Sequence, residues 1–282
     1  MLKVALFQSR GHPGDVAANV QLAKDTLAQA RTAGARLLLL PELFLSGYHL
    51  PADELHACAR NLESTEIQDL RNACRDAGCG MVLGYSELAD AGQVYNSAML
   101  IDSKGEIQLN YRKTHLYGPD EKAAFTEVPA AAATQSYTAV CKDFEGIPRF
   151  NVALLICYDV EFPEIVRSVC LHGATFVAIP TANFWTGIPR RVLPTRAIEN
   201  HAVIAYINRH GNERGLQFGG SSCIVGPDGE DLLRAADDEE QLLFCTVDLN
   251  KAEYVHLRNV NPYFADRKPQ LYQWLTDSSL PK

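Results

Sequence analysis

The sequence predicts one mixed α/β domain with ten or more strands in two sheets and helices on the outer faces. Short, wholly apolar runs such as 37–40 and 152–156 are typical of strands that are buried on both faces. They alternate with stretches in which apolar residues recur at helical spacing, and no linker, low-complexity segment or long-period repeat interrupts the 282 residues. Because strands buried on both faces need cover on both sides, the helices are expected to form the outer layers.

The first part of the chain predicts an alternation of strand and helix that then gives way to strands alone. A strand over 3–8 is followed by a helix that opens at Asp15 and closes at Gly34. The strand over 37–40 is stopped by Pro41. A helical region is expected over about 52–77, followed by three strands over 81–86, 94–101 and 106–112.

The second part predicts a return to alternation after a polar, alanine-rich loop over 118–136. Two helices are expected over about 163–172 and 190–200, and Pro163 and Gly173 fit the usual placement of proline at a helix start and glycine after its end. The remaining predicted strands cover 152–156, 176–179, 202–207, 221–225 and 242–247.

Composition and charge restrict the class of protein. With 47% hydrophobic and 21% charged residues, the chain has the composition of a globular protein. The formal net charge of −8 suggests no basic face for nucleic acid or for an anionic membrane. The longest apolar runs fall far short of the roughly 20 residues that span a bilayer, and no signal peptide precedes the first strand. We therefore expect a cytoplasmic protein without nucleic-acid or membrane partners.

The eight cysteines show no metal-binding or disulfide pattern, because no two form a C-x-x-C pair. Seven of them are interpreted as small hydrophobic residues, namely Cys58, Cys74, Cys79, Cys141, Cys170, Cys223 and Cys245. Cys157 differs from these seven in its position at the end of an apolar run, just before a predicted helix start.

Three segments put reactive side chains where a buried fold would not place them without a reason. Glu42 follows a run of four leucines, and an isolated ionised carboxylate would be costly to bury there. Lys113 lies at the end of another predicted strand. Cys157 ends an apolar strand that turns within a few residues into a helix start at Pro163. Together the three segments supply a base, a cation and a thiol.

Four short blocks contain these residues in a fixed order. They are Pro-Glu at 41–42, Tyr-Arg-Lys-Thr-His at 111–115, Cys-Tyr-Asp at 157–159 with Phe-Pro-Glu at 162–164, and Arg-Ala-Ile-Glu-Asn at 196–200. The blocks resemble the signature blocks of the nitrilase superfamily of carbon-nitrogen hydrolases, in family order and over nearly the whole chain. Within that superfamily the chain most resembles small aliphatic amidases of the 5-aminopentanamidase type.

The resemblance implies a single-domain α-β-β-α sandwich of the nitrilase type, a carbon-nitrogen hydrolase domain over 1–282. It also implies a homodimer or larger homo-oligomer, a small-molecule amide substrate, no cofactor and no metal. The Glu-Lys-Cys triad of the family maps onto Glu42, Lys113 and Cys157. Glu121 matches a second glutamate that many members use to orient the substrate amide.

The chemistry of the residues supports thiol-dependent hydrolysis of an amide to carboxylate and ammonia. A neighbouring ammonium and a helix N-terminus lower the pKa of a thiol, so we expect Lys113 and the following turn to favour the reactive thiolate of Cys157. Glu42 is expected to take the thiol proton, return it to the departing ammonia and then activate water against the thioester. Lys113 and the backbone N–H of Tyr158 are expected to stabilise the oxyanion.

The surroundings of the triad are predicted from strand ends. Asn183, Phe184 and Trp185 would line the substrate pocket if ligands bind at the carboxyl ends of strands, and core packing is the rival interpretation for the two aromatic residues. For Tyr111 and His115, structural support is favoured over catalysis, because a basic histidine would duplicate Glu42.

Glu161 is the residue expected to influence the choice of amide. Many relatives that act on carboxylate-bearing substrates have arginine four residues after the nucleophile, whereas this chain has Glu161. A carboxylate there would favour a substrate with a terminal amine, such as 5-aminopentanamide. The alternative is that Glu161 only stabilises a helix N-terminus.

Two other functions stay open at this point. One is hydrolysis of N-carbamoyl amines or amino acids by the same triad, for which Arg190 and Arg191 would supply pocket cations. The other is a catalytically silent binding protein that keeps the fold.

Overall fold

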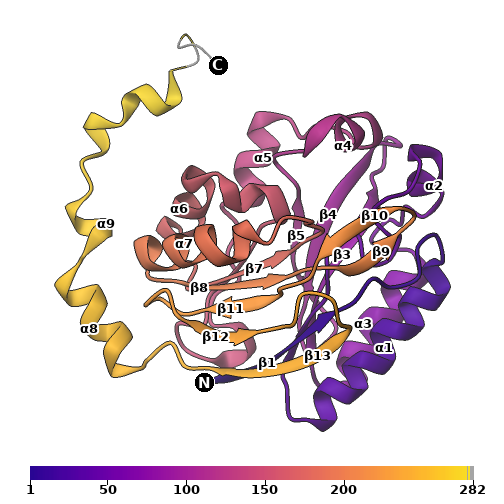
Figure 1. Ribbon diagram of the computed structural model, residues 1–282, viewed down its shortest axis with the longest axis horizontal. Coiled ribbons are helices and arrows are strands. Elements are labelled where there is room, and N and C mark those ends of the chain that lie inside the picture. The colour runs from indigo at the N-terminus through magenta and orange to yellow at the C-terminus, as the bar shows by residue number, and fades with distance from the viewer. Residues whose placement is uncertain (278, 280–282) are drawn as a thin grey trace.

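The computed structural model describes residues 1–277 and 279, and in this part of the chain two sheets stack face to face (Figure 1). In pairing order, the six-stranded sheet consists of β13 (Gln241–Val247), β1 (Leu2–Gln8), β2 (Leu37–Leu39), β3 (Gly80–Leu88), β4 (Val94–Ile101) and β5 (Ile107–Arg112). The five-stranded sheet consists of β12 (Asp231–Arg234), β11 (Cys223–Val225), β8 (Val203–Ile207), β7 (Phe176–Pro180) and β6 (Val152–Leu154). A separate hairpin joins β9 (His210–Glu213) to β10 (Leu216–Gly219).

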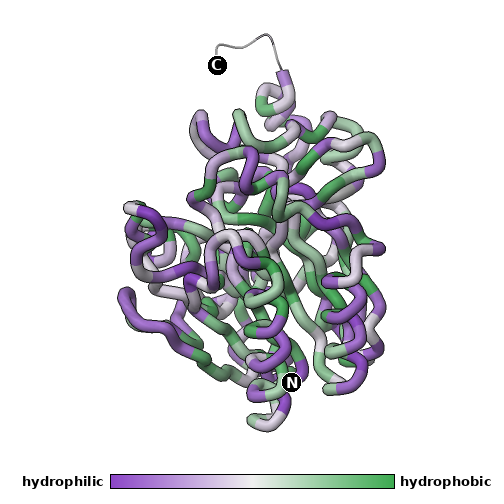
Figure 2. Tube along the Cα trace, turned by 90° about the vertical axis from the view of Figure 1, so that its right-hand side faces the viewer, coloured by the Kyte–Doolittle hydropathy of each residue, from purple (hydrophilic) through white to green (hydrophobic). Residues whose placement is uncertain are grey.

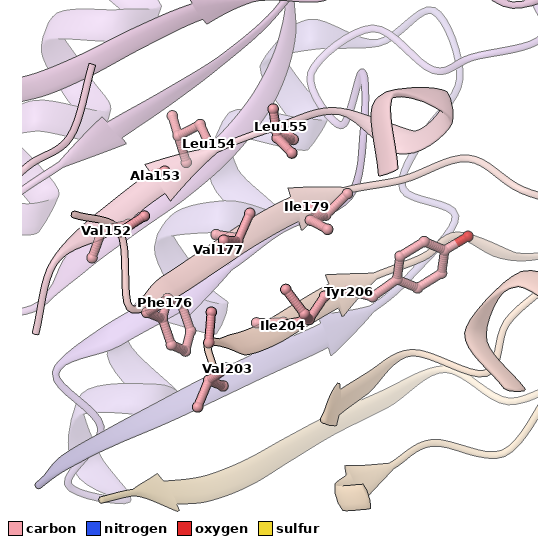
Figure 3. Packing of buried hydrophobic residues seen from close by; sticks show 14 of the residues in the cluster. Val152, Ala153, Leu154, Leu155, Phe176, Val177, Ile179, Val203, Ile204 and Tyr206 are labelled. Atoms are coloured by element: carbon pink, nitrogen blue, oxygen red, sulfur yellow. The ribbon is translucent and has the colours of Figure 1, made fainter. Parts of the chain in front are cut away.

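The leucine run before Glu42 shows how the layers are built. Successive side chains of a strand point to opposite faces of the sheet. Leu37 and Leu39 accordingly pack in the core between the two sheets, whereas Leu38 and Leu40 pack against the outer helices. Figure 3 shows the other sheet, where buried side chains of β6, β7 and β8 pack together.

Helices cover both outer faces, which confirms the predicted α-β-β-α sandwich. On the six-stranded sheet, α1 (Val16–Thr32) and α3 (Thr65–Ala77) bury one apolar face each. On the five-stranded sheet, α6 (Pro163–Leu171) and α7 (Leu193–Asn200) do the same. In Figure 2 the helical tubes alternate between hydrophilic and hydrophobic residues, the pattern of helices with one face on the interior. Asp15 caps α1 by accepting a hydrogen bond from the N–H of Ala18.

Strand direction places several loops at one end of the sandwich. In the six-stranded sheet β1, β2 and β3 are parallel, and β5 points the same way because it pairs antiparallel with β4, itself antiparallel to β3. In the five-stranded sheet β6, β7 and β8 are parallel. The carboxyl ends of these strands carry the segments that hold Glu42, Lys113, Cys157 and Asn183.

Two of the predicted segments differ in the structure. The loop expected over 118–136 contains α4 (Gly118–Ala124) and α5 (Ala130–Tyr137). Pro119 in the first turn of α4 and the alanines of α5 favour helix, and their propensity outweighs the polar composition. The helical region expected over 52–77 is two helices, α2 (Ala52–Ala57) and α3, because the chain between them leaves the helix to form a bridge from Arg60 to Glu87.

Other elements were not predicted. The strands β9, β10 and β12 are short and rich in polar residues or glycine, so they lack the apolar periodicity of the buried strands. A π-helical turn over Ile188–Val192 precedes α7. Short 3₁₀ turns occur at Phe144–Gly146, Cys157–Glu161, Pro269–Leu271 and Gln273–Thr276.

The segment from α8 (Ala252–Val260) onward leaves the sandwich and runs along its outside (Figure 1). It contacts the body through Tyr254 of α8, which is fully buried, and through α9 (Tyr263–Asp266), where Tyr263 stacks on His201 with ring centroids 5.0 Å apart. Beyond α9, Leu271, Trp274 and Leu275 are each more than 60% exposed. Among the described residues there is no helix with the length and apolar character needed to cross a bilayer.

Candidate active site

A buried ion cluster lies at the carboxyl ends of β2 and β5. The Lys113 ammonium donates hydrogen bonds to Glu42 Oε1 at 2.7 Å and to both carboxylate oxygens of Glu121 at 2.8 and 2.9 Å. All three residues are at most 5% exposed. One cation thus contacts two carboxylates, and this mutual attraction offsets part of the cost of burying the charges.

The two carboxylates of this cluster differ in their hydrogen bonding. Glu121 Oε1 also accepts from the Tyr48 hydroxyl at 2.6 Å, and Oε2 from the N–H of Tyr117 at 2.9 Å. Glu42 Oε1 accepts a further bond from the Asn96 amide at 2.7 Å, whereas its Oε2 is buried and has no hydrogen-bond partner among the described residues. One oxygen of Glu42 is therefore held by the protein and the other is left to act on a reacting group.

Burial and neighbouring charges set the protonation of the cluster. Burial raises the pKa of Glu42, Lys113 lowers it and Glu121 raises it, with a net upward direction. Burial lowers the pKa of Lys113, but the charges of Glu121 and Glu42 outweigh this effect. The net pKa lies well above its usual range. These directions favour the charged form of Lys113 and make Glu42 more basic than an exposed glutamate.

Cys157 lies in the turn between β6 and α6, with a positive φ of 44°. Burial is the largest effect on its thiol and raises the pKa, the Glu42 charge raises it further, and Lys113 lowers it. The net direction is upward, so Lys113 favours the thiolate but does not outweigh burial and the Glu42 charge. The sequence shows the cation and the helix start but not the density of protein around the sulfur. A protonated thiol needs a neighbouring base to take its proton before it can act as a nucleophile, and Glu42 can serve as that base.

The turn that carries the thiol is held by Asp159, a fully buried residue. Asp159 Oδ2 accepts hydrogen bonds from the Tyr111 hydroxyl at 2.7 Å and from the N–H of Ile156 at 3.0 Å. Its Oδ1 lies 2.8 Å from His115 Nδ1, and the His115 ring stacks on Phe162 at 3.9 Å between centroids. These contacts support the prediction that Tyr111 and His115 serve the structure of the site.

A cavity of about 230 Å³ opens over Cys157. Its lining includes the five predicted pocket residues other than Glu121, namely Tyr158, Glu161, Asn183, Phe184 and Trp185. The core-packing interpretation of Phe184 and Trp185 is wrong, because they are 46% and 55% exposed and lie at the cavity rim.

The polar residues of this cavity differ in whether their side chains are already hydrogen-bonded to the protein. Asn183 donates to the Tyr206 hydroxyl at 3.0 Å and accepts from the N–H of Trp185 at 2.7 Å, so its amide orders the loop. Arg196 pairs with Glu199 at 3.2 Å and donates to the backbone carbonyl of Glu161 at 2.9 Å, and the Glu161 carboxylate forms no ion pair with the described residues. Burial raises the pKa of Glu161, while Lys113 and Arg196 lower it, and the net direction is upward.

Glu121 borders a second, larger cavity of about 660 Å³ instead. Tyr117 and Phe184 line both cavities, and their rings meet edge to face with centroids 6.1 Å apart. Most of the second cavity is apolar, with Leu50, Leu55 and other side chains of the segment after Glu42 along one wall.

The sequence and the fold of the chain match those of known proteins. The family model described as carbon-nitrogen hydrolase covers residues 3–256. The chain belongs to the carbon-nitrogen hydrolase family. It is 34% identical over 274 residues to an (R)-stereoselective amidase of Pseudomonas sp., covering 96% of this chain and 93% of that one. It is 31% identical to a nitrilase of Pyrococcus abyssi, covering 96% and 99% of the two chains.

The fold of this carbon-nitrogen hydrolase is also found in the solved structure of a similar enzyme. It is a mutant of the amidase from Nesterenkonia sp. AN1 with acrylamide added at its active-site cysteine. The two structures align with a TM-score of 0.78, and the chains are 33% identical over 97% of this chain and 99% of that one. Another structure of that enzyme is described as an amidase of the nitrilase superfamily. These matches confirm the resemblance read from the sequence blocks: the chain is an amidase of the nitrilase superfamily.

Several residues around the ion cluster of this hydrolase were not predicted. Asn96 and Tyr48 contact the two carboxylates. Asn96 stands within the apolar run of β4, and a polar amide in such a run is a signal of the same kind as Glu42. Arg209 follows the apolar strand β8 and is fully buried, which is also such a signal.

Proposed function

We propose that this amidase hydrolyses a small aliphatic primary amide to carboxylate and ammonia, with Cys157 as nucleophile, Glu42 as base and Lys113 as the cation of the site. The observation that carries the proposal is the buried Oε2 of Glu42, which has no hydrogen-bond partner among the described residues, on a carboxylate that Lys113 holds and whose charge acts on the Cys157 thiol. Ammonia release from a panel of small amides, with the Cys157→Ala variant as control, tests it.

In the first half of the reaction, Glu42 Oε2 takes the proton of Cys157 as the sulfur attacks the amide carbon. Lys113 and the backbone N–H of Tyr158 stabilise the oxyanion. Glu42 then returns the proton to nitrogen, the carbon-nitrogen bond breaks and ammonia leaves a thioester on Cys157. In the second half, Glu42 deprotonates a water molecule that attacks the thioester, and breaking of the carbon-sulfur bond gives the carboxylate and restores the thiol.

Glu121 acts in this scheme chiefly through Lys113. Both of its oxygens already accept two hydrogen bonds from the protein, one of them in each case from Lys113. A carboxylate oxygen has about two lone-pair sites, so little capacity remains for a substrate amide. Its contacts support a role in fixing the Lys113 ammonium.

We further propose that the substrate carries a terminal amine that binds Glu161. This carboxylate lines the cavity over Cys157 and is the acidic residue of that lining. A charge-assisted hydrogen bond to a distant ammonium is worth about 1.5 to 3 kcal/mol, or roughly 10- to 150-fold in relative affinity.

The Glu161→Gln variant is expected to lose this preference. In the wild type we expect kcat/KM for 5-aminopentanamide to exceed that for glutarate monoamide roughly 10- to 150-fold, and in the variant we expect the two values to converge. Glu161 lies just before α6 and Glu164 in its first turn, but Glu164 is outside the cavity lining, so Glu164→Gln is the control for a helix N-terminus effect. If the ratio of the two kcat/KM values is the same in Glu161→Gln as in the wild type, Glu161 does not determine substrate specificity.

The alternatives are less well supported. Arg190, proposed as a pocket cation for carbamoyl substrates, pairs with Asp237 at 3.3 Å and is absent from the cavity lining. That lining holds no cation among the described residues. A silent binding protein would not need an unpartnered buried base beside a thiol.

We also propose a homodimer or larger homo-oligomer. The exposed Leu271, Trp274 and Leu275 of the C-terminal segment support this proposal, because apolar residues gathered on a monomer surface commonly mark a contact between proteins. Light scattering at micromolar concentration is expected to give at least twice the 31.1 kDa chain mass. A monomer would contradict it.

We propose a cytoplasmic location because the cysteines are unpaired. All eight are free in the structure, including Cys141 and Cys245, which are partly exposed. Unpaired thiols are typical of reducing compartments.

A further inference from the structure

A second buried ion pair, absent from the scheme above, lies directly behind the Glu42 segment. Arg209 Nη2 donates to Glu213 Oε2 at 2.8 Å, and both side chains are fully buried. Arg209 follows β8 closely, and Glu213 ends β9. Burying two charges is costly unless further hydrogen bonds satisfy them. Most of the further bonds of this pair go to the segment that carries the proposed base.

Arg209 holds the beginning of that segment. Its Nη1 donates to the backbone carbonyls of Glu42 at 3.0 Å and Leu43 at 3.3 Å, and its Nη2 also donates to the carbonyl of Arg10. Leu43 has a φ of 50°, a left-handed conformation that is uncommon for a residue other than glycine. The planar guanidinium is suited to hold this turn, because its donors have a fixed geometry.

Glu213 holds the end of the same segment. Its Oε1 accepts hydrogen bonds from the backbone N–H groups of Tyr48 at 2.7 Å and His49 at 2.6 Å. The hydroxyl of Tyr48 in turn donates to Glu121, which binds Lys113. The ion pair therefore holds both ends of the 42–49 segment. The first end contacts the Lys113 ammonium through the Glu42 carboxylate, and the second end is linked to it through Tyr48 and Glu121.

We propose that Arg209 and Glu213 are positioning residues that fix the 42–49 segment, so that Glu42 Oε2 faces the Cys157 thiol. The proposal rests on the function proposed above for Glu42 and Cys157. Neither positioning residue belongs to the lining of the cavity over Cys157. Their loss should therefore affect the proton transfer and leave substrate binding largely intact.

The test uses the isosteric Glu213→Gln variant, which places an amide against the Arg209 guanidinium, and Arg209→Lys, which keeps the charge but loses the planar fork. We expect kcat to fall about 10- to 100-fold in each, since small displacements of reacting groups cost this much, with KM changed less than about threefold. The alkylation rate of Cys157 by iodoacetamide, followed by mass spectrometry of its peptide, should fall in parallel.

Glu145→Gln is the matched control. Glu145 is also a buried carboxylate paired with an arginine, Arg36 at 3.0 Å, but Arg36 precedes the amino end of β2, away from Glu42. This variant is expected to lower the melting temperature without changing kcat or the alkylation rate. Wild-type kcat and alkylation rates in a folded Glu213→Gln or Arg209→Lys variant would assign the pair to stability alone and overturn the proposal.

The alkylation rate separates this proposal from the proposed function. If the wild type hydrolyses none of the amides, the proposed function fails, while the alkylation rates still report whether the pair positions Glu42. If Glu213→Gln does not fold, Arg209→Lys carries the comparison. If neither folds, Glu213→Asp keeps the charge but shortens the side chain, and wild-type rates in that variant would overturn the proposal.

Discussion

Replacing Cys157 by alanine is expected to abolish amide hydrolysis while the chain stays folded. In sets of residues that act as one unit, loss of a single member costs about 10⁴- to 10⁶-fold in kcat. The side chain is small and lines a cavity, so removal of its sulfur costs little packing. Initial rates of ammonia release, with the melting temperature measured on the same samples, check this expectation. Turnover above a few per cent of the wild-type rate would refute the thioester mechanism.

The other two members of the triad are expected to lose activity equally but to differ in stability. Glu42→Gln keeps the size of the side chain and removes the base. Lys113→Met leaves Glu42 and Glu121 buried without their cation, and breaking a buried ion pair in this way costs about 3 to 5 kcal/mol of folding free energy. A melting temperature of Lys113→Met equal to that of Glu42→Gln would contradict this account of the cluster.

Much of the fold could be predicted from apolar periodicity, because the strands β2, β6, β7 and β8 are wholly apolar and buried. The run Leu37 to Leu40 is buried on both faces, as its composition indicates. Glu42 and Cys157 were singled out because each directly follows such a run, whereas the triad itself, with Lys113, was assigned through the family resemblance. The carboxyl ends of parallel strands then bring Glu42, Lys113 and Cys157 to one edge.

The parts that could not be predicted depend on contacts between distant segments. The segment over 118–136 has the polar composition of a loop, yet α4 places Glu121 on Lys113. Arg209 contacts the carbonyl of Glu42 across 167 positions of sequence, and no local pattern indicates that partner. The direction of a pKa shift likewise depends on burial, which is a property of the folded state.

The pH dependence of Cys157 reactivity is expected to report Glu42 rather than the thiol itself. Glu42 acts as a base only when deprotonated, and its pKa is raised above 4.5, so the reaction should slow as the pH falls through that raised pKa. Below it, the deprotonated fraction and the alkylation rate of Cys157 should fall about tenfold per pH unit. Above it, the rate should reach a plateau while the thiol is still largely protonated, because the pKa of Cys157 lies well above 9.0.

The Glu42→Gln variant distinguishes this behaviour from that of a resting thiolate. Without the base, reaction at sulfur requires the free thiolate, whose fraction at neutral pH is small when burial raises the pKa. The plateau should therefore vanish, and the rate should keep rising with pH into the alkaline range. The measurement is the iodoacetamide alkylation rate of the Cys157 peptide between pH 5 and 10, with the exposed-thiol rate of free cysteine as reference. A resting thiolate would instead keep a fast, pH-independent rate at neutral pH in Glu42→Gln, and the raised pKa of Cys157 would then be wrong. If Glu42 is the base, the variant should be slowest relative to the wild type near neutral pH, and the two rates should approach each other as the thiol ionises by itself.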